Sequence, residues 1–354
     1  MTFSERARMI TGLLIAGLSI LSIIGISEAR AVTSKVVPLV VYSAQGYDAD
    51  VAKAFQAKTG IPVKLVDDST GPLLTKVAAE KNNPQWDILW VDGATPFAAL
   101  DKQGQLLSYI PKIALNAIGK AATPSDHSYV PVSITTMAAL IYNSSKVTNV
   151  PATFNDLLDP KRKGQIGMND PSQSGPTFPF VAGVMNQLGG KAKGLKAGEK
   201  YFIKLKANGL QVYPTNGDTL HALETGMINY GMIQSSAAIG EVIKFNKTSV
   251  AGFVPKIVLL PKQTLLPGVI GIDKHASSVA QAEAKRFVEY VLSAEGQKVM
   301  QDGDASGDSL YWPVVPGVKG LAGLPSVPVY QSIDPYFWGP QQSAIDTWFD
   351  STIK

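Results

Sequence analysis

The stretch VVPLVVYSAQGYDADVAKAFQAKTGIPVKLV, residues 36–66, decides the fold. Val36 to Tyr42 is an apolar run rich in β-forming residues, and a short polar turn follows it. From Asp48 to Thr59 apolar side chains recur at helical spacing, and a glycine ends the helix. Ile61 to Val66 then alternates like a second strand. The stretch therefore predicts a β-α-β unit.

The next segments extend this unit. Leu73 to Lys81 has a helical pattern, and Trp86 to Val91 is a third apolar strand. The order β-α-β-α-β implies right-handed crossovers and a parallel sheet. Ligands of such sheets bind at the carboxyl ends of the strands, where the polar turns Ser43–Gly46 and Val91–Ala94 are expected to lie.

From Tyr129 onward a second set of strands and helices follows. Two strands, 130–133 and 137–142, are expected with a short polar turn between them, and later strands are predicted at 164–168 and 230–234. In residues 280–300 apolar side chains recur at helical spacing, which predicts one strongly amphipathic helix. The Pro-rich, aromatic tail 311–354 is expected to cover one lobe.

The N-terminus predicts export. Arg6 and Arg8 precede an apolar run, Met9 to Ile26, and Ala29-Arg30-Ala31 is an A-x-A cleavage site. The sequence predicts a signal peptide over residues 1–31, cleaved after Ala31, and a mature protein in the periplasm. An uncleaved membrane anchor is the alternative, because the apolar run is long enough to span a bilayer.

Composition narrows the function classes. The chain has no cysteine, so disulfides and thiolate chemistry are excluded. Its net charge is +4, and no basic stripe with interleaved aromatic residues is present, so no nucleic-acid partner is expected. The mature chain is too long for one typical core, which indicates two lobes.

The segment Asp170-Pro171-Ser172-Gln173-Ser174-Gly175-Pro176-Thr177 joins a predicted strand to a predicted helix. The first turn of a helix has unpaired N–H donors and the positive end of the helix dipole, so such a turn suits an anion. The alternative is an ordinary helix cap. Two further helix starts, at Asn216-Gly217-Asp218 and Ser235-Ser236, carry the same residue types.

The chain resembles the periplasmic solute-binding proteins of ABC importers. The resemblance rests on "VAKAFQAKTGIPVKLV", on "WDILWVDGATPFAALDKQGQL" (residues 86–106) and on "AEAKRFVEYVLSAEGQKVM" (residues 282–300). The nearest branch binds ferric ion, aminoethylphosphonate and sugar phosphates. It implies an α/β, two-lobed periplasmic-binding-protein fold (type II), each lobe a mixed sheet flanked by helices, that closes over a ligand. The expected lobes are residues 32–132 with 266–310, and 133–265 with 311–354.

Ferric binders of this branch carry two consecutive tyrosines at the start of a second-lobe helix. The corresponding residues here are Ser236 and Ala237, and the first-lobe metal ligands correspond to Gly46 and Asp92. Ferric iron prefers anionic oxygen ligands, so their loss disfavours iron. The resemblance then implies that the three helix starts hold a phosphonate or phosphate of the ligand itself.

The first lobe is expected to bind the other end of the ligand. Asp92 is a candidate acceptor for an ammonium or hydroxyl group, and capping of its own helix is the alternative. Three aromatic residues, Tyr47, Trp90 and Tyr311, belong either to the cleft wall or to the core. The predicted ligand-binding residues are Ser43, Gln45, Asp92, Ser133, Ser172, Ser174, Gly175, Thr177, Asn216, Gly217, Asp218, Ser235 and Ser236.

No catalytic motif accompanies these residues. The sequence lacks a nucleophile elbow, a Walker loop and a His-Glu-x-x-His pair, and its three histidines show no metal-ligand spacing. We therefore expect a monomeric binding protein without cofactor or metal. It would deliver a small anionic solute, 2-aminoethylphosphonate first, to an ABC permease in the inner membrane. A sugar-phosphate binder, a carrier of iron or another metal chelate, and an adhesin or sensor partner on the same fold are the alternatives.

Overall fold

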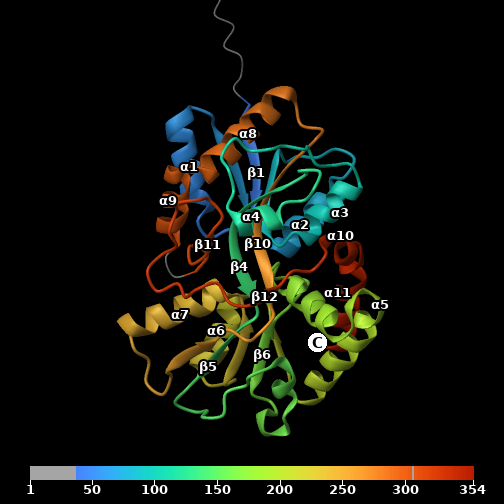
Figure 1. The fold of residues 1–354 in the computed structure, drawn as a ribbon, viewed down its shortest axis with the longest axis vertical. Coiled ribbons are helices and arrows are strands. Elements are labelled where there is room, and N and C mark those ends of the chain that lie inside the picture. The colour runs from blue at the N-terminus through green and yellow to red at the C-terminus, as the bar shows by residue number, and fades with distance from the viewer. Residues whose placement is uncertain (1–36, 305–306) are drawn as a thin grey trace, which may run out of the picture. The chain divides into compact units, whose positions relative to one another are not determined.

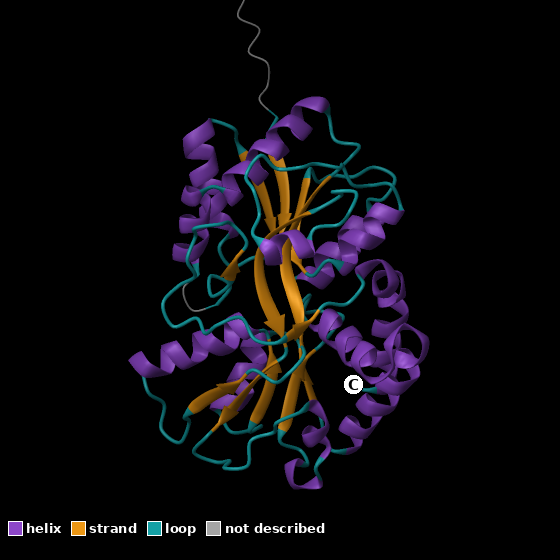
Figure 2. Ribbon diagram, in the orientation of Figure 1, coloured by secondary structure: helices purple, strands orange, loops and turns teal. Residues whose placement is uncertain are grey.

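Two β-sheets with helices on both faces organise the chain (Figures 1 and 2). The computed structural model describes residues 37–304 and 307–354, so the predicted signal peptide lies outside the described residues. Residues 37–354 form one compact unit, and the two sheets define the two lobes within it. The expected α/β two-lobed class is confirmed. No helix in the described part of the chain has the length and apolar character needed to cross a membrane.

The first lobe is built on a seven-stranded sheet. Its order is β11-β4-β10-β3-β1-β2, and β12 pairs with β10. Strands β1, β2 and β3 are parallel, as the β-α-β pattern predicts, whereas β10 runs antiparallel to β3 and β4. The strands are β1 (Leu39–Ser43), β2 (Val63–Asp67), β3 (Ile88–Asp92), β4 (Val130–Met137), β10 (Gln263–Ile272), β11 (Trp312–Pro313) and β12 (Tyr330–Gln331).

The second lobe is built on a five-stranded sheet of order β7-β6-β8-β5-β9. Its strands β6, β7 and β8 are parallel, which repeats the arrangement of the first lobe. The strands are β5 (Ala139–Asn143), β6 (Ile166–Asn169), β7 (Gln211–Tyr213), β8 (Tyr230–Ile233) and β9 (Pro255–Val258).

Helices cover both sheets. In the first lobe these are α1 (Asp48–Thr59), α2 (Thr70–Ala79), α3 (Thr95–Lys102), α4 (Ala117–Ala122), α8 (Ser278–Leu292) and α9 (Ala294–Gly303). In the second lobe they are α5 (Thr177–Ala207), α6 (Asn216–Glu224) and α7 (Ser235–Lys247), with 3-10 turns at Phe154–Leu158 and Pro160–Arg162. The tail adds α10 (Pro335–Trp338), a 3-10 turn (Gly339–Gln341) and α11 (Gln342–Thr352).

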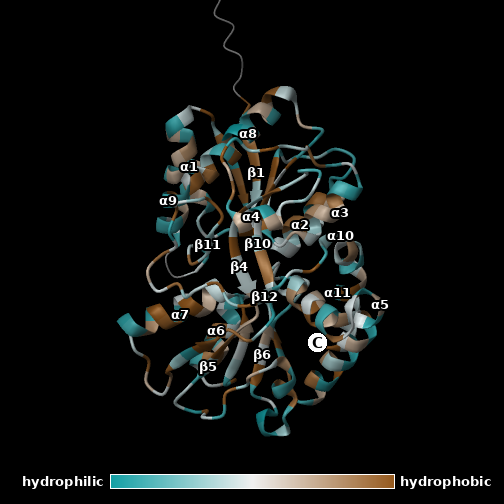
Figure 3. Cartoon of the chain, in the orientation of Figure 1, coloured by the Kyte–Doolittle hydropathy of each residue, from teal (hydrophilic) through white to brown (hydrophobic). Residues whose placement is uncertain are grey.

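The central strands of each sheet are buried on both faces, which explains why they are nearly continuous apolar runs. In β1, Leu39 and Val41 belong to one buried cluster and Tyr42 to another on the opposite face. In β5, Leu140 and Ile141 divide in the same way. Figure 3 shows the apolar colouring concentrated on the strands and the helix faces that cover them. Each large apolar side chain buried in this way stabilises the fold by about 1.5–3 kcal/mol.

Three local expectations differ from the structure. Residues 134–136, expected as a turn between two strands, continue strand β4, because both faces of β4 are buried. The Pro267-Gly268 pair, which favours a turn between strands in the sequence 258–272, lies inside β10, where the pairing with β4 shifts register. The single helix predicted over 280–300 is two helices, since Ser293 accepts a hydrogen bond from the Gly296 N–H and caps α9.

The tail, expected to cover one lobe, packs into the cores of both lobes. Tyr311 and Val314 are buried in the first-lobe core. Trp338 and Phe349 are buried in a second-lobe cluster with residues of α5. The lobe boundaries expected at 132/133 and 265/266 stay a prediction, while β4 and β10 belong along their whole length to the first sheet.

Candidate ligand-binding site

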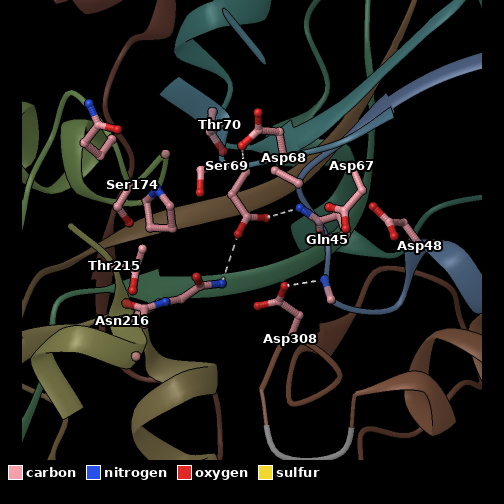
Figure 4. A pocket seen from close by; sticks show the side chains of 18 of the residues that line it. Gln45, Asp48, Asp67, Asp68, Ser69, Thr70, Ser174, Thr215, Asn216 and Asp308 are labelled. Carbon is pink, nitrogen blue, oxygen red and sulfur yellow. Dashed lines mark hydrogen bonds between the residues drawn. The ribbon is translucent and has the colours of Figure 1, made fainter. Parts of the chain in front are cut away.

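A cavity of about 390 Å³ lies at the carboxyl ends of both sets of parallel strands (Figure 4). Residues from both lobes form its walls. They are Ala44, Gln45, Gly46, Asp48, Ala49, Asp67, Asp68, Ser69, Thr70, Asp92 and Asp308 from the first lobe, and Gln173, Ser174, Gly175, Pro176, Thr215, Asn216, Gly217 and Gln234 from the second. This is where an open α/β sheet is expected to bind its ligand.

Three helix starts of the second lobe reach the cavity. Helix α5 begins at Thr177 after the segment Gln173–Pro176, α6 begins at Asn216, and α7 follows Gln234. The N–H groups of a first helical turn have no partner within the helix and carry the positive end of its dipole. Their meeting at one cavity provides neutral donors for an anion.

The buried side-chain amide of Asn169 orients two hydrogen-bond donors on the second-lobe wall of the cavity. Asn169, the last residue of β6, donates from Nδ2 to Asn216 Oδ1 (2.6 Å) and to Ser174 Oγ (3.3 Å). Its own Oδ1 accepts from Thr219 Oγ1 (2.7 Å), which fixes its orientation. Because the oxygens of Asn216 and Ser174 are engaged as acceptors, the Asn216 NH₂ group and the Ser174 hydroxyl hydrogen remain as donors.

The first-lobe wall has the opposite character. Five aspartates line it: Asp48, Asp67, Asp68, Asp92 and Asp308. The described residues that line the cavity include no lysine, arginine or histidine. Asp67 ends β2, Asp92 ends β3, and Asp48 opens α1. Asp308 Oδ2 accepts a hydrogen bond from the Gly46 N–H (2.8 Å). The cavity is therefore dipolar, with donors on one side and carboxylates on the other.

Burial without a basic partner raises the pKa of these carboxyls. Desolvation, followed by the nearby Asp308 charge, raises the pKa of Asp92 to about 7. Desolvation is also the main reason that the pKa of Asp48 rises to about 6 and that of Asp308 to about 6, with Asp67 and Asp304 respectively adding repulsion. These groups would all be stabilised in their charged form by a bound cation.

Asp92 joins the two lobes. Its Oδ1 accepts from Gln45 Nε2 of the first lobe (3.2 Å), and its Oδ2 accepts from Gln234 Nε2 of the second (3.1 Å). A second contact between the lobes lies at the edge of the cavity, where the Gly71 N–H donates to the Gln173 carbonyl (3.2 Å). These two contacts hold the lobes together beside the cavity.

The structure brings some predicted site residues to the cavity and not others. Those that line it are Gln45, Asp92, Ser174, Gly175, Asn216 and Gly217. Ser43, Ser133, Thr177, Ser235 and Ser236 are buried and do not line the cavity. Ser172 donates to Asp170, and Asp218 forms a capping box with Thr215. The cap interpretation holds for Asp218, whereas the Ser172 hydroxyl bonds a neighbouring carboxylate and caps no helix.

Four lining aspartates were absent from the sequence-based set: Asp48, Asp67, Asp68 and Asp308. The first three follow strand ends, a signal that was available in the sequence. Asp308 is far along the chain, after helix α9, and it reaches the cavity where α9 packs against α1 and where the Gly46 N–H binds its carboxylate. The aromatic residues Tyr47, Trp90 and Tyr311 are buried in the first-lobe core and do not wall the cleft.

The described residues include no group of three or more His, Cys, Asp or Glu side chains placed to hold a metal ion. The lining carboxylates therefore do not form a metal-binding cluster. They spread a negative potential over a wall.

Comparisons with known proteins agree with this fold. The family model for bacterial extracellular solute-binding proteins matches residues 50–325. A Salmonella paratyphi A protein named "Putative 2-aminoethylphosphonate-binding periplasmic protein" is 28% identical over 290 residues, covering 79% of this chain and 80% of that protein. Two solved structures share the fold. AfuA of Actinobacillus pleuropneumoniae with fructose-6-phosphate has a TM-score of 0.73 at 22% identity, covering 89% of this chain and 98% of that one. Iron-bound HitA of Pseudomonas aeruginosa has a TM-score of 0.71 at 22% identity, covering 88% and 98%.

Proposed function

Because this chain belongs to the bacterial extracellular solute-binding protein family, we propose that it captures a small phosphorus-containing anion, with 2-aminoethylphosphonate as the first candidate. The name of the Salmonella relative supports that candidate. Export after cleavage at Ala31, action as a monomer and delivery of the solute to an ABC permease in the inner membrane are parts of the same proposal.

One observation carries the proposal. The starts of α5 and α6 face the cavity, and Asn169 orients the donors of Ser174 and Asn216 toward it. A tetrahedral oxyanion needs several donors that point inward, and short side chains and backbone N–H groups supply them with little rearrangement.

A sugar phosphate and ferric iron are the alternative ligands for this site. A sugar phosphate, as in AfuA, would place its phosphate at the same helix starts and its hydroxyls against Asp92, so it is the second candidate. Ferric iron, which HitA contains, prefers anionic oxygen ligands. The family resemblance implies that Ser236 and Ala237 stand where ferric binders of this branch carry paired tyrosines. The structure supports iron less than either phosphorus ligand.

The experiment is titration calorimetry with 2-aminoethylphosphonate, ethylphosphonate, inorganic phosphate and ferric citrate. We expect Asn216→Ala and Ser174→Ala each to weaken every phosphorus ligand about tenfold or more, since a hydrogen bond to a charged group contributes about 1.5–3 kcal/mol. Asn155→Ala is the control, because Asn155 is exposed on the second lobe and does not line this cavity. Tight binding of ferric citrate with no binding of any phosphorus ligand would overturn the proposal.

A further inference from the structure

We propose that the ligand is a zwitterion and that its ammonium group binds a carboxylate subsite formed by Asp48, Asp67 and Asp308. This inference rests on the proposed function and deepens it, because it fixes the chemical class of the solute and its orientation. The anionic end lies on the helix starts of the second lobe, and the cationic end lies on the first lobe.

Asp48 gives the first reason. The side chain lines the cavity, yet the residue is only 3% exposed, and its Oδ2 atom makes no hydrogen bond within the described residues. The neighbouring Ser43 hydroxyl lowers the pKa of this carboxyl, but by less than desolvation raises it. A buried carboxylate oxygen without a donor is unfavourable, whereas an ammonium group brings three donors and a compensating charge. Figure 4 shows Asp67 beside Asp48 at the same end of the cavity.

Asp308 gives the second reason and fixes the orientation. Its carboxylate accepts the N–H of Gly46, just before α1, so an anion of the protein already occupies this helix start beside Asp48. The start of α2 also lines the cavity, and there Asp68 Oδ1 accepts the Ser69 N–H (2.7 Å). A ligand phosphonate placed there would meet Asp308 and Asp48 as like charges. The second-lobe helix starts carry no such carboxylate on the cavity wall, since the described lining residues of that lobe include no aspartate or glutamate.

The nature of the cation follows from the donor geometry. No three carboxylates in the described chain are arranged around a single point that would suit a metal ion. No lysine or arginine of the described chain forms an ion pair with Asp48, Asp67 or Asp308. A spread wall of carboxylates suits a hydrated or hydrogen-bonded ammonium group better than a metal. A cavity of about 390 Å³ accepts only a small ligand.

The test compares 2-aminoethylphosphonate with ethylphosphonate, which keeps the phosphonate and the two-carbon chain but lacks the amine. The wild-type protein should bind the amine-bearing ligand about tenfold or more tightly, as a charge-paired contact requires. Asp48→Asn and Asp308→Asn should each reduce this preference to about threefold or less while changing the ethylphosphonate affinity less than about twofold. Asp50→Asn is the matched control, since it removes the same charge from the exposed side of α1.

The outcomes separate the two proposals. Equal affinity of the wild-type protein for both ligands, or an unchanged preference in Asp48→Asn and Asp308→Asn, overturns the zwitterion subsite and leaves the phosphonate function standing. Failure of both ligands to bind the wild-type protein overturns the proposed function, and the subsite with it. Thermal unfolding of each variant confirms that it is folded, and the wild-type comparison requires no variant at all.

Discussion

Replacing Gly71 with alanine is expected to weaken binding of 2-aminoethylphosphonate about 30-fold, which corresponds to about 2 kcal/mol. Gly71 lies in the first turn of α2, where its N–H contacts the Gln173 carbonyl of the other lobe. A Cβ atom at this position would lie 2.2 Å from the Ser172 carbonyl oxygen and 3.1 Å from Gln173 Cα. Both neighbours are backbone atoms, so the contact between the lobes must open.

The effect should fall on ligand binding and not on folding. The backbone of Gly71 needs no positive φ, and alanine is the better helix former. Calorimetry gives the affinity, and thermal unfolding of the ligand-free variant should stay within about 2 °C of the wild-type midpoint. Thr75→Ala, one turn further along α2 on its exposed side, is the control. An unchanged affinity in Gly71→Ala would mean that the ligand does not need this contact.

The ligand-free protein is expected to lose stability as the pH rises from about 5 to about 8, by on the order of 3 kcal/mol. The pKa of Asp92 is raised to about 7, and those of Asp48 and Asp308 to about 6, above the value of about 4 in an unfolded chain. Between these values the folded state binds more protons than the unfolded state. The stabilisation is therefore complete below about pH 4 and is lost as the pH rises through the folded-state pKa values.

The variant Asp92→Asn should remove part of this loss, because its side chain stays neutral. Its unfolding midpoint should exceed that of the wild type by about 4 °C at pH 8, and the difference should close near pH 4.5. Calorimetric scans of both proteins at several pH values measure this difference. A wild-type midpoint that rises between pH 5 and pH 8 would contradict the pKa assignment. Saturating 2-aminoethylphosphonate should flatten the wild-type profile, since its ammonium group would compensate the carboxylates.

Much of the fold could be predicted because it depends on local patterns. The helix predicted over 48–59 coincides with α1, and the β-α-β order correctly predicted the parallel pairing of β1, β2 and β3. The errors arose where tertiary packing decided the structure. Buried neighbours keep residues 134–136 in strand β4, and the tail is divided between both cores through Tyr311 and Trp338.

The site was predicted better on its second-lobe side than on its first. Ser174, Gly175, Asn216 and Gly217 line the cavity because helix starts have recognisable residues and a fixed relation to strand ends. Asn169 was missed since nothing local shows that one amide would contact two separate helix starts. Asp308 was missed because it lies beside the contact between α9 and α1, and a contact between distant segments leaves no local sequence pattern.

A crystal structure of the protein with 2-aminoethylphosphonate tests the central claim most directly. The account predicts that the phosphonate oxygens lie within hydrogen-bonding distance of Ser174 and Asn216 and of the N–H groups at the start of α6. It also predicts that the amine lies against Asp48 and Asp308. A phosphonate on the first-lobe carboxylate wall, or a ligand outside the cavity between the two sets of strand ends, would contradict it.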